Sequence, residues 1–232
     1  MRYHIDFELD FKRNNEKGFL IAIEGIDGAG KTTQARLVSE ELAKNNTVHL
    51  TKNPTDGLIG KFIREVLAGK IKIPSSSIQY LFSADRQVQQ VEVLNDLKDG
   101  KIIITDRYFW SAIVYGIVDR EDLDFDQAGN LLLVSQGILS MYHKFIVPDL
   151  TIYLDITMEA ALERINGKKI AKEIYENEEK LKKIEKGYKW LINKFANEFT
   201  IVDGTKPEKE ITQEIIQIFN NLKNKKKTLN GK

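Results

Sequence analysis

The clearest chemical pattern in the chain is the glycine-rich segment GIDGAGKT at residues 25–32. It matches the spacing G-x-x-x-x-G-K-[ST], in which glycines let the backbone approach a phosphate and successive N–H groups face the anion. The Lys31 ammonium can reach the β- and γ-phosphates of a nucleotide, and the Thr32 hydroxyl can hold Mg²⁺. We therefore predict that a nucleoside triphosphate is bound by Gly25, Ile26, Asp27, Gly28, Ala29, Gly30, Lys31, Thr32 and Thr33.

The flanking residues give this segment the context that its chemistry needs. Residues 19–24 (FLIAIE) are almost continuously apolar and predict a buried strand, and residues 32–44 predict a helix. A plain glycine-rich turn is the alternative, but it does not require the lysine and the threonine. ATPases, GTPases, motors and small-molecule kinases share such a loop. A GTPase is disfavoured, because we find no N-K-x-D segment after a strand.

A second polar group, Asp106-Arg107-Tyr108, directly follows the apolar run at residues 101–105. Asp106 can hold a Mg²⁺ water, and Arg107 offers a bidentate cation suited to a second phosphate. A simple ATPase needs the carboxylate but not the arginine and the aromatic residue beside it. Lys31, Asp106 and Arg107 are therefore the predicted catalytic residues, with Thr32 and Asp106 as the metal site.

Short apolar runs and helical patterns alternate along the chain, which predicts an α/β protein. We expect a three-layer P-loop NTPase fold, with a five-stranded parallel sheet flanked by helices and with a short lid. Parallel sheets bind ligands at the carboxyl ends of their strands, where the polar groups above lie. The predicted strands are residues 19–24, 47–51, 101–105, 150–155 and 199–203. The predicted helices are residues 32–44, 58–68, 75–97, 123–143, 158–164, 171–196 and 207–222.

Composition limits the remaining possibilities. The 232 residues suit one α/β domain, and a net charge of +1 gives no reason to expect a nucleic-acid or membrane partner. The absence of cysteine excludes disulfides and thiolate chemistry. Without a long apolar run or a signal-peptide core, we expect a cytoplasmic protein. We divide the chain into an N-terminal extension (1–17), a single kinase domain (18–222) and a flexible basic tail (223–232).

Four segments in order, IAIEGIDGAGKTTQ, LFSADR, DRYFWSAIVYG and PDLTIYLDI, resemble the thymidylate kinase family. The resemblance covers about residues 19–218. It implies ATP-dependent phosphorylation of thymidine monophosphate (dTMP) to dTDP, with Mg²⁺ as cofactor and a homodimeric assembly. Two alternatives stay open: a kinase of other nucleoside monophosphates or deoxynucleosides, and a P-loop ATPase switch that acts on a protein partner.

The resemblance also implies roles for single residues. Asp27 would contact the sugar 3′-hydroxyl, Phe82 would stack on thymine, and Arg86 would hydrogen-bond the base. Without the resemblance, the favoured interpretations are a core residue for Phe82 and a solvated arginine for Arg86. Tyr115 would disfavour a 2′-hydroxyl, or would simply be a core aromatic. The complete implied acceptor site is Asp27, Lys52, Phe82, Arg86, Arg107, Ser111 and Tyr115.

The chain departs from the family pattern in two places. In the segment Lys52-Asn53-Pro54, lysine stands where the family has arginine. Lysine keeps the positive charge but lacks the planar guanidinium that can hold a phosphate through two hydrogen bonds. The expected lid, about residues 165–174, contains no arginine. The missing lid cation would be a lysine or the neighbouring Arg164, unless these lysines only form a solvated helix face. The candidates are Arg164, Lys168, Lys169 and Lys172. The adenine ring would lie over Asp203 and Gly204.

Overall fold

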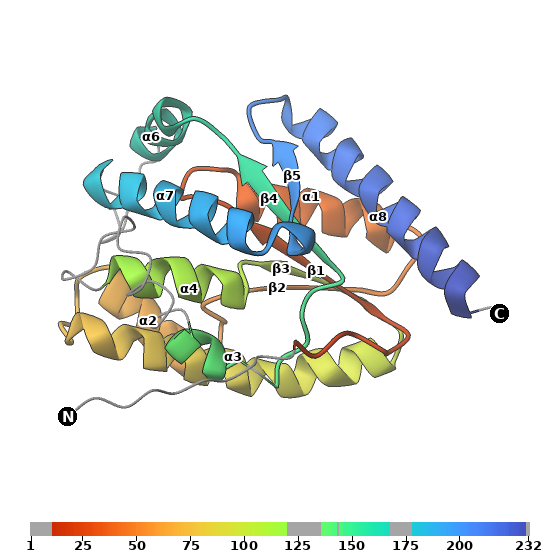
Figure 1. Cartoon of the computed structure of the whole chain (residues 1–232), viewed down its shortest axis with the longest axis horizontal. Helices are drawn as coiled ribbons and strands as arrows, with labels where there is room; N and C mark the ends of the chain where they lie inside the picture. The colour runs from red at the N-terminus through yellow and green to blue at the C-terminus, as the bar shows by residue number, and fades with distance from the viewer. Residues whose placement is uncertain (1–10, 120–135, 143, 168–177, 231–232) are drawn as a thin grey trace.

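The structure, a computed structural model, is built on a five-stranded parallel sheet (Figure 1). It describes residues 11–119, 136–142, 144–167 and 178–230. The strand order is β2-β3-β1-β4-β5, which confirms the predicted α/β class with strands one and three side by side. The strands are β1 (Phe19–Glu24), β2 (Val48–Lys52), β3 (Ile102–Asp106), β4 (Leu150–Asp155) and β5 (Thr200–Asp203).

The two central strands bring the site residues together. Every residue of β1 and β3 is buried, as expected for strands that are covered on both faces. The register pairs Ile23 of β1 with Asp106 of β3, and it pairs Lys52 of β2 with the same Asp106. Three strands therefore end at one level, and the loops that leave them meet at a single edge of the sheet.

Helices cover both faces of this sheet (Figure 1). On one side of the sheet, α1 contacts α8. On the other side, α4 contacts both α3 and α7, and α2 packs on α3. Among the described residues, no helix has both the length and the apolar character needed to cross a membrane. The helices are α1 (Lys31–Ala43), α2 (Leu58–Leu67), α3 (Ser75–Lys98), α4 (Phe109–Val118), α6 (Met158–Asn166), α7 (Glu178–Lys194) and α8 (Glu208–Asn230), with a 3₁₀ turn at Ala196–Glu198.

Helix α4 is the element that the sequence did not predict. Its residues Phe109 to Ile117 are all buried, so the run is apolar on every side and has no amphipathic period. It is also rich in aromatic and β-branched residues, which favour strands. The predicted helix at 123–143 falls largely outside the described residues, although residues 136–140 are helical.

The predicted flexible tail from residue 223 is wrong for the described residues, because α8 continues through Asn230. Lys226 holds this end of the helix. Its Nζ donates to the carbonyls of Glu16 (3.2 Å) and Gly18 (3.4 Å) and lies 4.6 Å from the centre of the Phe19 ring. Lys226 is thus packed against the segment that leads into β1.

The described part of the predicted N-terminal extension is also packed on the domain. The Phe11 ring lies 5.6 Å from Trp110 and 6.0 Å from Phe195, measured between ring centroids. Arg13 forms two hydrogen bonds to the carboxylate of Glu198. Phe11 and Arg13 therefore pack against α4 and the segment between α7 and β5.

Candidate active site

A cavity of about 530 Å³ opens at the carboxyl edge of the sheet, a volume within the usual range for small-molecule sites. Its lining comes from the glycine loop after β1, the loops after β2 and β3, helices α2, α3 and α4, and the segment after β5. The polar residues that were predicted from separate parts of the sequence are therefore gathered around one space.

The glycine loop has the backbone conformation that its sequence predicts. Gly28 and Gly30 have φ angles of 85° and 92°, which favour glycine. A Cβ atom on Gly28 would lie 2.6 Å from the carbonyl oxygen of Ala161, so a side chain there has no room. Residues 27–33 line the cavity. Gly25 and Ile26 lie behind it, where their carbonyls accept hydrogen bonds from Arg107 and Lys31.

Thr32 and Asp106 form the predicted metal pair. The Thr32 hydroxyl donates to Oδ2 of Asp106 at 2.5 Å, which directly joins the start of α1 to the end of β3. Oδ1 of Asp106 is buried and has no hydrogen-bond partner among the described residues. A buried carboxylate oxygen without a partner is costly unless a ligand occupies it. Hydroxyl and carboxylate oxygens are hard ligands, so this pair fits Mg²⁺.

Arg107 turns back towards the glycine loop. Its backbone has a φ of 69°, and its guanidinium donates to the Gly25 carbonyl at 3.2 Å and to the Ser111 hydroxyl at 3.1 Å. It also donates to the carboxylate of Asp27. The cation after β3 and the loop after β1 therefore face the same cavity.

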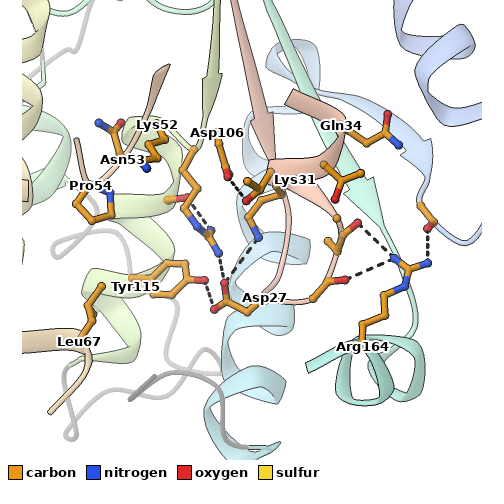
Figure 2. Close-up of a pocket in the computed structure, with 18 of the residues that line it drawn as sticks. Asp27, Lys31, Gln34, Lys52, Asn53, Pro54, Leu67, Asp106, Tyr115 and Arg164 are labelled. Carbon is orange, nitrogen blue, oxygen red and sulfur yellow. Dashed lines mark hydrogen bonds and ion pairs between the residues drawn. The ribbon is translucent and has the colours of Figure 1, made fainter. Parts of the chain in front are cut away.

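Asp27 is the meeting point of these groups (Figure 2). It accepts a hydrogen bond from the Tyr115 hydroxyl at 2.8 Å, and the Lys31 ammonium lies 3.7 Å away. Burial acts to raise the pKa of Asp27, but the charges of Arg107 and Lys31 and these hydrogen bonds outweigh it and lower the pKa to about 2. Asp27 is therefore an anion that is held inside the cavity.

For Lys31, burial outweighs the neighbouring carboxylates in setting the pKa. Its Nζ donates to the carbonyl of Ile26 at 2.7 Å. Burial and then the nearby charge of Arg107 lower its pKa to about 8, although Asp27, Asp106 and Glu24 act to raise it. An anionic phosphate beside Lys31 would relieve both of the effects that lower the pKa.

Two residues of the site, Glu24 and Tyr188, were missed by the sequence analysis. Glu24 ends β1, is fully buried, and accepts hydrogen bonds from the Tyr108 backbone N–H (2.9 Å) and the Ser111 hydroxyl (2.6 Å). The Tyr188 hydroxyl donates to the same carboxylate at 2.8 Å and accepts from Arg107 at 3.3 Å. Glu24 could have been predicted, because an acidic residue that ends an apolar strand often belongs to a site at the edge of the sheet. Tyr188 lies on distant α7, where nothing marks it.

Helix α3 places Phe82 and Arg86 on one face. The guanidinium carbon of Arg86 lies 5.2 Å from the centroid of the Phe82 ring, and both residues line the cavity. Arg86 is buried and donates to Oδ1 of Asn53 (3.3 Å) and the hydroxyl of Tyr142 (3.1 Å). The interpretation of Arg86 as a solvated arginine is therefore wrong.

A further cation beside the loop after β2, Arg64, was not predicted from the sequence. Lys52 lines the cavity and is about half exposed, and its Nζ lies 3.1 Å from Asp56. Arg64 of α2 lines the same cavity and donates to the carbonyls of Pro54 (3.0 Å) and Thr55 (2.7 Å). A guanidinium is thus present at this loop, although it comes from a helix and not from the position of Lys52.

At the opposite end of the cavity, Arg164 spans two loops. Its Nη2 donates to the Gly204 carbonyl at 3.1 Å, and its Nη1 lies 3.5 Å from the carbonyls of Gly28 and Ala29 (Figure 2). Gly204 lines the cavity, whereas the carboxylate of Asp203 accepts from Thr205 instead. The lid lysines Lys168, Lys169 and Lys172 lie outside the described residues.

Comparisons with known proteins give one consistent result. The family model described as "Thymidylate kinase" matches residues 23–215. A probable thymidylate kinase from Methanococcus maripaludis is 39% identical over 210 residues, which cover 88% of this chain and 92% of the relative. A thymidylate kinase from Leptospira borgpetersenii is 34% identical over 208 residues, with 88% and 94% of the two chains covered.

A solved structure agrees with these sequence comparisons. The thymidylate kinase of Candida albicans matches with a TM-score of 0.72 and 30% identity, over 89% of this chain and 93% of that one. The chain therefore belongs to the thymidylate kinase family.

Proposed function

We propose that this enzyme transfers the γ-phosphoryl group of ATP to the 5′-phosphate of dTMP, giving dTDP and ADP. The observation that carries the proposal is the convergence of Lys31 and Arg107 on Asp27 inside one cavity. One cation belongs to the loop that binds the donor phosphates, and the other follows the neighbouring strand. Two phosphates held by these cations would face each other across the cavity.

On the donor side, the backbone N–H groups of residues 27–33 and the start of α1 bind the ATP phosphates, and Lys31 neutralises them. Thr32 and Asp106 would hold Mg²⁺, which neutralises negative charge on the β- and γ-phosphates when it is bound. Arg164 lies where the glycine loop meets Gly204, beside the expected adenine position. We assign the missing lid cation to Arg164, or to a lysine at 168, 169 or 172.

On the acceptor side, Phe82 stacks on thymine and Arg86 donates to its O4 atom. Asp27 accepts from the 3′-hydroxyl, and Tyr115 occupies the space that a 2′-hydroxyl needs. Arg107, with Lys52 and Ser111, binds the 5′-phosphate. The attacking oxygen of that phosphate is already anionic, so no strong base is required and catalysis consists of positioning and charge neutralisation.

The direct test is ADP release in the presence of ATP and one acceptor at a time. We expect dTMP to be the best acceptor among dTMP, dUMP, dCMP, dAMP, dGMP and thymidine. Preference for thymidine would support a deoxynucleoside kinase instead, and preference for another monophosphate would change the substrate. Steady ADP release that no acceptor alters would support the ATPase switch.

We also propose that the enzyme works as a homodimer through α3, which runs along the lower border of the molecule in Figure 1. Tyr80, Val88 and Val91 on this helix are 70%, 67% and 65% exposed, and their spacing places them on one face. We expect a Val88→Lys/Val91→Lys variant to be monomeric by light scattering. Leu58→Lys, at an apolar residue of α2 that is 87% exposed, is the control and should leave the dimer intact.

A cytoplasmic location stays a prediction from the sequence.

A further inference from the structure

Gln79 is a polar residue of the cavity that the roles above do not use. It lies on α3, three residues before Phe82 and seven before Arg86, so the three side chains share one face of the helix. Gln79 lines the same cavity and is only 7% exposed. A buried amide on the wall of a binding site needs partners for both its nitrogen and its oxygen.

The orientation of this amide is set by Asp119. The Nε2 atom of Gln79 donates to Oδ2 of Asp119 at 2.8 Å. An ionised carboxylate only accepts hydrogen bonds, so the nitrogen must face Asp119 and the oxygen must face away from it. The side chain of Gln79 also packs closely against α4. A Cβ atom added at Gly116 would lie only 3.4 Å from Cγ of Gln79, so the side chain has little room to move on that side.

The amide oxygen of Gln79 has no hydrogen-bond partner in the described part of the chain. Oε1 is buried, and among the residues that the structure describes no donor lies within hydrogen-bonding distance of it. Leaving such an acceptor unsatisfied is costly, and a ligand that offers an N–H group at this point removes the cost. The geometry therefore provides an acceptor on the helix face that carries Phe82 and Arg86.

We propose that Oε1 of Gln79 accepts the N3–H of thymine, next to the O4 atom that Arg86 binds; this inference rests on the proposed function. The edge of thymine presents an acceptor, O4, beside a donor, N3–H. Arg86 supplies donors and Gln79 supplies an acceptor, so the pair matches this edge. Cytosine has an amino group where thymine has O4, so a donor would face the donors of Arg86. Its unprotonated N3 is an acceptor and would face the acceptor oxygen of Gln79.

The test is the Gln79→Met variant, which keeps the length of the side chain and removes the acceptor. We expect kcat/KM for dTMP to fall about tenfold, mainly through KM, because the buried N3–H would lose its partner. dUMP has the same edge and should lose activity by the same factor. The rate with dCMP should not fall, so the ratio of dTMP to dCMP activity should drop about tenfold. The KM for ATP should not change.

Gln87→Met is the matched control, because Gln87 lies on the exposed side of the same helix and should keep wild-type ratios. A dTMP-to-dCMP ratio in Gln79→Met within twofold of the wild-type value overturns the inference. Should that variant not fold, Asp119→Asn replaces it: the amide of Gln79 can then rotate, and the same ratio should fall, whereas an unchanged ratio overturns the inference. A wild-type enzyme that does not phosphorylate dTMP would instead contradict the proposed function itself.

Discussion

Arg107 donates a hydrogen bond to Asp27, so the first residue after β3 is joined directly to the variable position of the glycine loop after β1. This contact places the predicted acceptor cation within the donor loop. The φ of 69° at Arg107 turns the side chain towards the loop, and Tyr115 and Lys31 approach the same carboxylate. A nucleotide that bound at Asp27 would therefore lie beside Lys31, the lysine predicted to bind phosphate.

Replacing Arg107 by lysine tests whether the guanidinium fork matters beyond its charge. A lysine keeps the charge but lacks the planar fork whose two nitrogens reach Gly25, Ser111 and Asp27 from different sides, so we expect kcat/KM for dTMP to fall about 100-fold. The KM for ATP should change little. Arg36→Lys is the control, because Arg36 is exposed and pairs with Glu40 one turn further along α1. A loss of less than about threefold would show that charge alone is sufficient.

Asp106→Asn tests the metal site. The amide keeps the size of the side chain but removes the negative charge and one hard oxygen ligand. We expect kcat to fall about 100-fold and the Mg²⁺ concentration for half-maximal activity to rise. Removing divalent ions with EDTA should stop the wild-type reaction, and added Mg²⁺ should restore it. An unchanged Mg²⁺ dependence in the variant would place the metal elsewhere.

The pKa of Lys31 predicts how ATP affinity depends on pH. In the free enzyme this pKa is lowered to about 8, and bound phosphates should raise it. At pH 7 the ammonium is mostly charged before ATP binds. Above pH 8 binding requires proton uptake, so the Kd for ATP should rise with pH, by up to about tenfold per unit. Calorimetry in buffers of different ionisation enthalpy measures both effects, and a constant Kd from pH 7 to 9 would contradict them.

Thr55→Val tests the anchoring of the loop after β2. The backbone N–H and the hydroxyl of Thr55 donate to the two carboxylate oxygens of Asp85 at 2.8 and 2.6 Å, and Asp85 is buried. Without the hydroxyl, one carboxylate oxygen of the buried Asp85 loses its partner, and the loop that follows Lys52 loosens. We expect the KM for dTMP to rise about fivefold. Thr55→Ser should restore it, and equal KM values for the valine and serine variants would exclude this role.

Phe219→Ala measures the contribution of α8 to stability. Phe219 is fully buried, and its ring meets that of Phe19 edge-on at 5.2 Å between centroids. We expect the free energy of unfolding to fall by about 3–5 kcal/mol in urea denaturation. Leu58→Ala, at an exposed position, should cost less than about 0.5 kcal/mol. Equal losses in the two variants would mean that α8 adds little to the core.

The sequence alone predicted the sheet and the phosphate loop, because both depend on local patterns. A continuous apolar run predicts a buried strand, and glycines at fixed spacing predict the backbone of the loop. It missed α4, whose burial on every side removes the amphipathic period. It also ended α8 too early, since Lys226 in the extension of this helix contacts Glu16, Gly18 and Phe19 at the other end of the chain.

For the site, the residue types and their spacing were sufficient to predict Lys31, Thr32, Asp106 and Arg107 as neighbours. Tertiary structure alone determined that Tyr188 and Arg64 join them and that Oε1 of Gln79 has no protein partner among the described residues. These contacts connect helix residues to the loops that follow β3 and β2. Local sequence determines the conformation of each segment, but the groups that meet in a cavity depend on how the segments pack around a common core.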